Sequence, residues 1–394
     1  MKLLFDLNSL RPPRSGIGYY TQHLLEGLRA RSDVEDVAGW MVSEVFQGEK
    51  LSRLVDGEIA APVMPGAANG ASPSLMSSIR RLPALQPLRT AMHRRASRVL
   101  RDDFATRGYV YHETNFIASQ YRGPTAVTIH DLSHRRHPEF HQKVAVDHLN
   151  RGLPRTLEQA RTIIVDSEYT KRELLALYDV PEHKVVTIYL GVDASFHPYA
   201  APECAPTLER LGLRRDGFVL SVCTLQPRKN LARLVAAFGR LPTSVRREFP
   251  LVLIGADGWK NSELLSLVES MVAAREIVVP GYLQRADLLH LYASATVFAY
   301  PSLYEGFGLP VAEAMASGTP VLTSNVTSIP EVAGGAALEV DPLSVDAITE
   351  GLQALLNNAP LRAELAAKGL RRAAELTWDS TVQQTCDVYR ALAS

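Results

Sequence analysis

Short apolar runs rich in valine and isoleucine alternate with amphipathic stretches along most of the chain. These runs lie at residues 2–5, 125–129, 162–165, 184–189, 218–222, 251–254, 276–279, 296–299 and 320–323. Runs of this length and composition are typical of strands that are buried on both faces, as in parallel sheets. The alternation of such strands with helices predicts an α/β protein built from βαβ units.

The length of the chain and one break in this alternation predict two domains. A chain of 394 residues is longer than a single core usually supports. Residues 191–206 are rich in Gly, Pro and Ala, and the strand pattern restarts at Phe218. We therefore expect Rossmann-like domains at 1–199 and 200–376 that face each other across a cleft, followed by an amphipathic helix in 377–394.

Composition excludes several classes of function. The 42 basic and 42 acidic residues give a net charge of zero, which lacks the basic excess of a nucleic-acid-binding protein. Three scattered cysteines are too few for a disulfide framework or a thiolate metal site. The first apolar run is shorter than a signal peptide core, and no run reaches the length of a membrane span. We expect a cytoplasmic protein that is soluble or peripheral to a membrane.

One group of histidines could be mistaken for a metal site. His134, His137 and His141 lie close together in the sequence. No acidic or cysteine ligands with clear spacing accompany them, so we expect no metal site there.

The segment YEGFGLPVAEAMASGTPV, at 304–321, places Glu305 and Glu313 eight positions apart across a predicted loop-to-helix junction. Gly306 and Gly308 allow the backbone to approach a ligand closely, and free amides at a helix start can bind a diphosphate. Glu305 would face a sugar, and Glu313 would accept hydrogen bonds from ribose hydroxyls. The alternative is that both glutamates only complement the helix dipole.

Two adjacent cations follow the strand at 218–222. In the segment CTLQPRKN, at 223–230, Arg228 and Lys229 would lie at the carboxyl end of a parallel strand, where such sheets bind ligands. Fixed cations there would stabilise the negative charge that develops on a departing nucleoside diphosphate. The alternative is an ordinary surface pair.

These segments resemble the retaining glycosyltransferases of family 4, which carry a Glu-x7-Glu signature and adopt the two-domain GT-B fold. Residues 223–230 resemble the family's Gly-Thr-Leu-Glu-Pro-Arg-Lys-Asn element, except that Cys223 replaces the usual glycine and Gln226 a common glutamate. The resemblance covers essentially the whole chain and is nearest to bacterial GDP-mannose-dependent mannosyltransferases of surface polysaccharide synthesis. It implies that the last helix crosses back onto the first domain.

The resemblance also assigns roles to residues. It places His130 beside the donor sugar, although a lone histidine after a strand is often structural. The catalytic set that it implies is His130, Glu305, Arg228 and Lys229. The donor-binding set is Gly16, Ile17, Gly18, Tyr282, Gly306, Phe307, Gly308, Leu309 and Glu313. His112 and Asn115, which follow the apolar residues 109–111, are the candidate acceptor contacts.

The glycine loop at 16–18 has two other interpretations. A dinucleotide-binding fingerprint would place a third glycine at position 21, where Thr21 stands, so the dehydrogenase interpretation is disfavoured. The loop could also be a plain strand-to-helix turn. The same alternative applies to Tyr282.

The reaction that the resemblance implies is transfer of a hexosyl unit, with retention, from a nucleoside diphosphate sugar. The expected donor is GDP-mannose, and the expected acceptor is a hydroxyl of a growing, lipid-linked polysaccharide. No metal cofactor is expected, because the chain lacks the Asp-x-Asp motif by which another glycosyltransferase fold holds a divalent ion. Three alternatives remain at this stage: another GDP-, UDP- or ADP-sugar as donor, an epimerase or hydrolase on the same fold, and a catalytically silent sugar-nucleotide-binding scaffold.

One basic segment interrupts the α/β pattern. Between Glu58 and Asp102 there is no acidic residue. The arginines in this interval are Arg80, Arg81, Arg89, Arg94, Arg95, Arg98 and Arg101. Leucines alternate with them over 80–101, which suits an interfacial helix on the anionic inner face of the plasma membrane. The alternative is a solvated helix whose arginines pair with acidic residues elsewhere.

Overall fold

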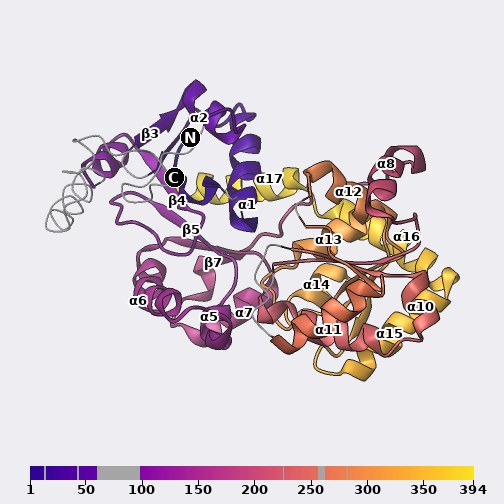
Figure 1. Ribbon diagram of the computed structural model, residues 1–394. Helices are drawn as coiled ribbons and strands as arrows, with labels where there is room; N and C mark the ends of the chain where they lie inside the picture. The colour runs from indigo at the N-terminus through magenta and orange to yellow at the C-terminus, as the bar shows by residue number, and fades with distance from the viewer. Residues whose placement is uncertain (13–14, 42–43, 60–97, 225, 256–261, 282) are drawn as a thin grey trace, which may run out of the picture.

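The structure is a computed structural model that describes all residues except 13–14, 42–43, 60–97, 225, 256–261 and 282. Two β-sheets flanked by helices form two domains that lie side by side (Figure 1). This arrangement confirms the predicted α/β architecture of two parallel-sheet domains.

The N-terminal sheet has the strand order β3-β2-β1-β4-β5-β6-β7, in which only the pairing of edge strand β3 with β2 is antiparallel among the described strands. The strands are β1 (Lys2–Asp6), β2 (Asp36–Met41), β3 (Glu44–Gln47), β4 (Tyr109–Glu113), β5 (Thr125–Ile129), β6 (Thr162–Val165) and β7 (Val185–Thr187). The helices are α1 (Gly16–Arg29), α2 (Gly48–Val55), α5 (Ser133–Arg136), α6 (Lys143–Gln159) and α7 (Glu168–Leu177).

The C-terminal sheet is parallel and has the order β10-β9-β8-β11-β12-β13, which is the order of a Rossmann sheet. The strands are β8 (Val219–Val222), β9 (Leu251–Ile254), β10 (Ile277–Val278), β11 (Val297–Tyr300), β12 (Val321–Ser324) and β13 (Leu338–Val340). The helices are α8 (Ala201–Leu211), α9 (Leu231–Gly239), α10 (Thr243–Glu248), α11 (Ser262–Ala273), α12 (Arg285–Ser294), α13 (Leu309–Ala316), α14 (Ile329–Ala333), α15 (Val345–Asn357) and α16 (Ala359–Glu375). The strand order reverses between β8 and β11, and ligands bind beside such a reversal at the carboxyl ends of the strands.

Each of the nine predicted runs coincides with a strand, because parallel strands covered by helices on both faces are continuously apolar. Four strands, β2, β3, β4 and β13, were not among these runs. Strand β13 has only three residues, and β4 carries polar side chains that are nevertheless buried. Polar residues of this kind are stable inside a sheet when they have hydrogen-bond partners, which a sequence pattern does not reveal.

The last helix, α17 (Trp378–Ala393), returns to the N-terminal domain and lies beside α1 (Figure 1). This confirms the crossing that the family resemblance implied. At the crossing point, Val192 forms an isolated bridge with Thr377. A Cβ atom on Gly191 would lie 2.2 Å from the backbone nitrogen of Trp378, so this close approach requires glycine. Among the described residues, no helix has the length and apolar character needed to span a membrane.

Candidate active site

The predicted site residues gather at the carboxyl ends of strands from both sheets. Arg228 and Lys229 follow β8, Glu305 follows β11, and His130 follows β5 of the other domain. In parallel sheets all these strand ends lie on one edge, and here the two edges meet. The topology therefore brings together side chains that are up to 175 positions apart, from 130 to 305.

Glu305 is the centre of a buried polar cluster. Its side chain is almost fully enclosed, and its residue exposure is 6%. Lys229 Nζ lies 2.7 Å from Oε1 and Arg228 Nη1 lies 2.9 Å from Oε2. The hydroxyls of Tyr300 and Ser302 also donate to Oε1, at 2.8 and 2.6 Å. Four donors thus replace the water that this carboxylate loses on folding.

This arrangement fixes the ionisation of Glu305. Burial alone would raise its pKa, but Lys229 and Arg228 outweigh burial and lower the pKa of Glu305 to about 2. For the Lys229 ammonium, burial has the opposite sign and lowers the pKa, and the Glu305 carboxylate opposes that effect. The cluster is therefore an ion pair near neutral pH.

Lys229 and Arg228 do not use all of their N–H groups among the described residues. Within the described part of the chain, Lys229 uses two of its three N–H groups, for Glu305 and the Tyr300 hydroxyl. Arg228 donates from Nη1 to Glu305 and to the Tyr304 carbonyl, and from Nε to Gln226. We predicted that the two cations bind phosphate and that Glu305 binds the sugar. In the structure these three side chains are hydrogen-bonded to each other in one cluster.

His130 is held between two acceptors. Its Nδ1 lies 2.7 Å from Asp166 Oδ2, and its Nε2 lies 2.9 Å from the carbonyl oxygen of Thr114. Both ring nitrogens must carry a proton to satisfy this arrangement, so the geometry favours the imidazolium form. Burial lowers the pKa of His130, but Asp166 more than offsets this, and the net direction is upward.

The loop that carries Glu305 touches the loop that carries His130. A Cβ atom on Gly306 would lie 1.8 Å from the His130 carbonyl oxygen, so the two backbones are in direct contact across the domain junction. Gly308, at the start of α13, has a φ of +108° that favours glycine. In this structure, the close approach made possible by Gly306 is therefore to the other domain.

Glu313 lies in α13 and accepts a hydrogen bond from the Tyr292 hydroxyl at 3.0 Å. Burial raises the pKa of Glu313 to about 7, and the bond from Tyr292 only partly counteracts this. The two glutamates of the signature therefore differ: Glu305 stays ionised, whereas Glu313 changes charge near neutral pH.

The other predicted donor residues have varied placements. Gly16, Ile17 and Gly18 form the first turn of α1 and not a turn before it. Phe307 is buried, with its ring centroid 6.1 Å from that of Tyr189. Leu309 is the first residue of α13. Tyr282 lies outside the described residues.

The two residues predicted to contact the acceptor differ in their exposure to solvent. His112 is fully buried, and its nitrogens bond to the Tyr389 hydroxyl at 2.6 Å and the Thr128 hydroxyl at 2.8 Å. His112 therefore joins β4 to α17 and, contrary to our expectation, has no nitrogen left for an acceptor. Asn115 is exposed just beyond the same strand and remains a candidate contact.

Cys223 occupies the position where the family element that residues 223–230 resemble carries a glycine. It is buried, and burial raises the pKa of its thiol to about 12, so it acts as a small neutral side chain. A Cβ atom on Gly255 would lie 1.9 Å from the Cys223 carbonyl oxygen, which shows that the backbone remains closely packed here.

Several residues of the site were not predicted, namely Asp166, Tyr300 and Ser302. Asp166 follows the strand at 162–165, and the rule that pointed to Arg228 and Lys229, a polar residue after a buried strand, could have found it. Tyr300 and Ser302 lie at and just after the end of β11, so the same rule could have found them too. Among the described residues, no group of three or more His, Cys, Asp or Glu side chains is arranged to hold a metal ion.

Comparison with known proteins agrees with this fold. The model of "Glycosyltransferase Family 4" matches residues 14–196, and that of "Glycosyl transferases group 1" matches residues 209–372. The O-antigen chain mannosyltransferase B of Escherichia coli is 34% identical over 393 residues, which cover 100% of each chain. The chain belongs to glycosyltransferase family 4. The serotype-specific mannosyltransferase WbdA of Escherichia coli is 31% identical over 60% of this glycosyltransferase and 29% of WbdA.

Solved structures share the fold of this glycosyltransferase. Anabaena HepE in complex with UDP has a TM-score of 0.71 at 18% identity, with 99% of this chain and 100% of HepE covered. WaaG, a glycosyltransferase involved in lipopolysaccharide biosynthesis, has a TM-score of 0.70 at 15% identity, with 99% of each chain covered. Both likenesses support the GT-B architecture.

The Glu305 cluster generates a stability prediction. In Glu305→Gln, two buried cations lose their shared carboxylate, and we expect the free energy of unfolding at pH 7 to fall by about 3–5 kcal/mol. The double variant Lys229→Met/Glu305→Gln removes one of these two uncompensated cations and should recover part of this loss. Urea denaturation measures both. Equal instability of the single and double variants would contradict a charge-paired cluster.

Proposed function

We propose that this glycosyltransferase moves a mannosyl unit from GDP-mannose to a hydroxyl of a growing surface polysaccharide, with retention of configuration. The observation that carries the proposal is the meeting of His130 from one domain with the Glu305, Arg228 and Lys229 cluster of the other. The full-length likeness to an O-antigen chain mannosyltransferase supports the sugar and the kind of acceptor.

In the proposed reaction, the remaining donors of Lys229 and Arg228 bind the diphosphate together with backbone amides at the start of α13. The bond between the anomeric carbon and the diphosphate oxygen breaks, and negative charge grows on the departing phosphate. Preorganised cations stabilise that charge more strongly in the transition state than in the ground state.

The acceptor hydroxyl then forms the new bond from the same face of the sugar, and its proton passes to an oxygen of the departing diphosphate. Glu305 Oε2 has one donor among the described residues, so it has room for a sugar hydroxyl. The imidazolium of His130, which is paired with Asp166, adds a fixed charge on the N-terminal side of the junction. No covalent enzyme intermediate is part of this scheme.

We further propose that the acceptor is lipid-linked and that the basic segment at 80–101 contacts an anionic membrane. Most of this segment lies outside the described residues. Arg101 is described, and it donates to the Gln120 carbonyl at 2.9 Å and lies over the Trp40 ring. Arg101 is therefore occupied within the protein, and the membrane proposal rests on the other arginines.

Donor selectivity tests the function directly. We expect GDP and GDP-mannose, without added metal, to raise the melting temperature more than UDP, ADP or their sugar conjugates, because binding to the native state stabilises it. Incubation with GDP-mannose should release GDP rapidly only when a mannan-type acceptor is present. Selectivity for UDP or ADP would rule out GDP-mannose as the donor. Rapid release of GDP without an acceptor would indicate a hydrolase. Binding of the nucleotide sugar without transfer would indicate a silent scaffold.

The pKa of Glu313 generates a prediction for donor affinity. The carboxylate form accepts hydrogen bonds from ribose hydroxyls, and this form is lost as pH falls through about 7. We expect the Kd for GDP to rise about tenfold per pH unit below 7, as binding must first deprotonate Glu313. Glu313→Gln should bind more weakly at pH 8 but lose this pH dependence. Isothermal titration calorimetry measures both, and an unchanged slope in Glu313→Gln would refute the assignment.

A further inference from the structure

The start of helix α7 in the N-terminal domain is hydrogen-bonded to the loop at 301–308 of the C-terminal domain, which we call the donor loop. The hydroxyls of Ser167 and Thr170 donate to the Gly306 carbonyl oxygen, at 2.6 and 3.2 Å. Because Gly306 follows Glu305 directly, these bonds act on the segment that carries the central carboxylate.

The same helix start is also capped from the other domain. Glu331, in α14, accepts from the backbone N–H groups of Glu168 at 2.6 Å and Tyr169 at 3.0 Å. These amides are among those that a helix cannot satisfy internally, so a carboxylate is well placed there. The beginning of α7 is thus fixed relative to the C-terminal domain.

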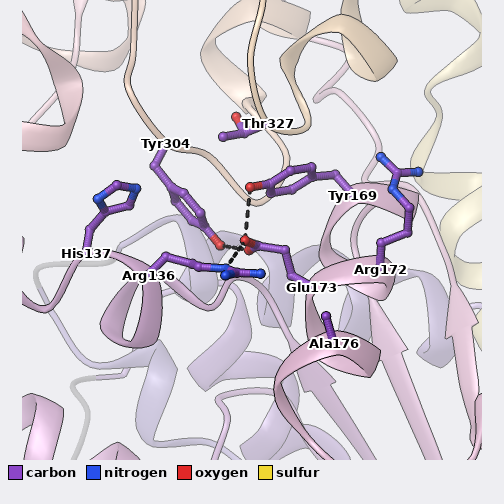
Figure 2. Close-up of a pocket in the computed structure, with 8 residues that line it drawn as sticks. All are labelled: Arg136, His137, Tyr169, Arg172, Glu173, Ala176, Tyr304 and Thr327. Carbon is purple, nitrogen blue, oxygen red and sulfur yellow. Dashed lines mark hydrogen bonds and ion pairs between the residues drawn. The ribbon is translucent and has the colours of Figure 1, made fainter.

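One hydroxyl links three segments at this junction. Tyr304, in the C-terminal domain, donates to the Glu173 carboxylate of α7 and accepts from the backbone N–H of Leu132 at 3.1 Å. Figure 2 shows the Tyr304 hydroxyl directed at Glu173. Tyr304 precedes Glu305, and Leu132 lies two positions after His130. This hydroxyl is therefore one of the contacts, together with those of Ser167 and Thr170, that set the distance between the two site residues.

The carboxylate of Glu173 is held in place by three hydrogen-bond donors. Its exposure is only 6%, and besides Tyr304 it accepts from Arg136 Nε at 2.6 Å and from the Tyr169 hydroxyl at 3.0 Å. A carboxylate with three donors has a fixed orientation, and its hydrogen bonds are stronger than those between neutral groups.

A pocket of about 470 Å³ opens beside these side chains, and residues of both domains line it (Figure 2). Tyr304 is itself only 1% exposed, and its ring centroid lies 5.4 Å from that of His137 and 6.1 Å from that of Tyr169. The bonds of its hydroxyl to Glu173 and Leu132 add to this packing across the domain junction.

We propose that Glu173 and Tyr304 are positioning residues for glycosyl transfer, which tie the Glu305 loop to the His130 loop and hold the two domains at their reactive separation. Neither side chain contacts Glu305, Arg228 or Lys229 among the described hydrogen bonds, although the Tyr304 carbonyl accepts from Arg228. The proposal rests on the proposed function for its kinetic consequences, but its structural consequence is independent of it.

Tyr304→Phe removes only the linking hydroxyl. We expect kcat for mannosyl transfer to fall about 10–100-fold, since a displacement of about 1 Å between reacting groups can cost 10²-fold in rate. The affinity for GDP should stay within about twofold of wild type, because Arg228, Lys229 and Glu313 are untouched. This split between kcat and nucleotide affinity distinguishes positioning from a general loss of structure.

Three variants act as controls. Tyr178→Phe, at the end of the same helix, removes a buried hydroxyl that has no hydrogen-bond partner among the described residues, and it should leave kcat unchanged. Glu173→Gln keeps an oxygen that can accept from Tyr304 but replaces the oxygen that accepts from Arg136 and Tyr169, whereas Glu173→Ala removes both. We therefore expect the glutamine variant to lose less activity than the alanine variant, which should match Tyr304→Phe.

A distance measurement tests the link without turnover. Val144 and Leu343 are 78% and 64% exposed, unlike the three cysteines, which are all buried. Spin labels at Val144→Cys and Leu343→Cys report the separation of the domains by pulsed electron paramagnetic resonance. Tyr304→Phe should broaden this distance distribution, and Tyr178→Phe should not.

The outcomes separate the two proposals. Wild-type kcat and an unchanged distance distribution in Tyr304→Phe would overturn the positioning role, as would a parallel loss of kcat, GDP affinity and melting temperature. If the wild-type protein transfers no mannose, but Tyr304→Phe still broadens the distribution, the proposed function fails and the interdomain link stands.

Discussion

The site depends on the burial of one carboxylate with two cations. Removing Glu305, Arg228 and Lys229 from water is costly, and the cost is offset only because every charge has a partner at hydrogen-bond distance. Arg228 also accepts from Leu303 N at 2.8 Å through its own carbonyl, so the cluster fixes the backbone of the donor loop. The loop in turn meets the N-terminal domain at Gly306.

The site has fixed charges from both domains, one set on each side of the domain junction. One side offers cations and an ionised Glu305, and the other offers His130 between Asp166 and the Thr114 carbonyl. In a partly dry environment such preorganised groups act strongly on charge that develops during a reaction, and they need not reorganise as it develops. This arrangement accounts for phosphate departure without assigning any side chain as a nucleophile.

Much of this could be predicted from the sequence because it depends on local pattern. Nine strands appeared as apolar runs, Arg228 and Lys229 were predicted from their place after a buried strand, Glu305 from the spacing of two glutamates, and His130 from the family resemblance. The pairing of Glu305 with both cations was not predicted, since it joins residues 76 and 77 positions apart. His112 misled us because its burial depends on Tyr389 from the returning helix α17. The link from Tyr304 to Glu173 spans 131 positions and leaves no local signature.

The ionisation of Glu305 can be measured directly in protein labelled with ¹³C at the glutamate carboxyl carbons, with Glu305→Gln used to assign its resonance. If Lys229 and Arg228 hold the carboxylate as described, its chemical shift should stay constant from pH 8 down to about pH 4, because its pKa lies near 2. A titration with a midpoint at 4.5 or above would show that Glu305 is not paired with these cations, and the account of the site would be contradicted.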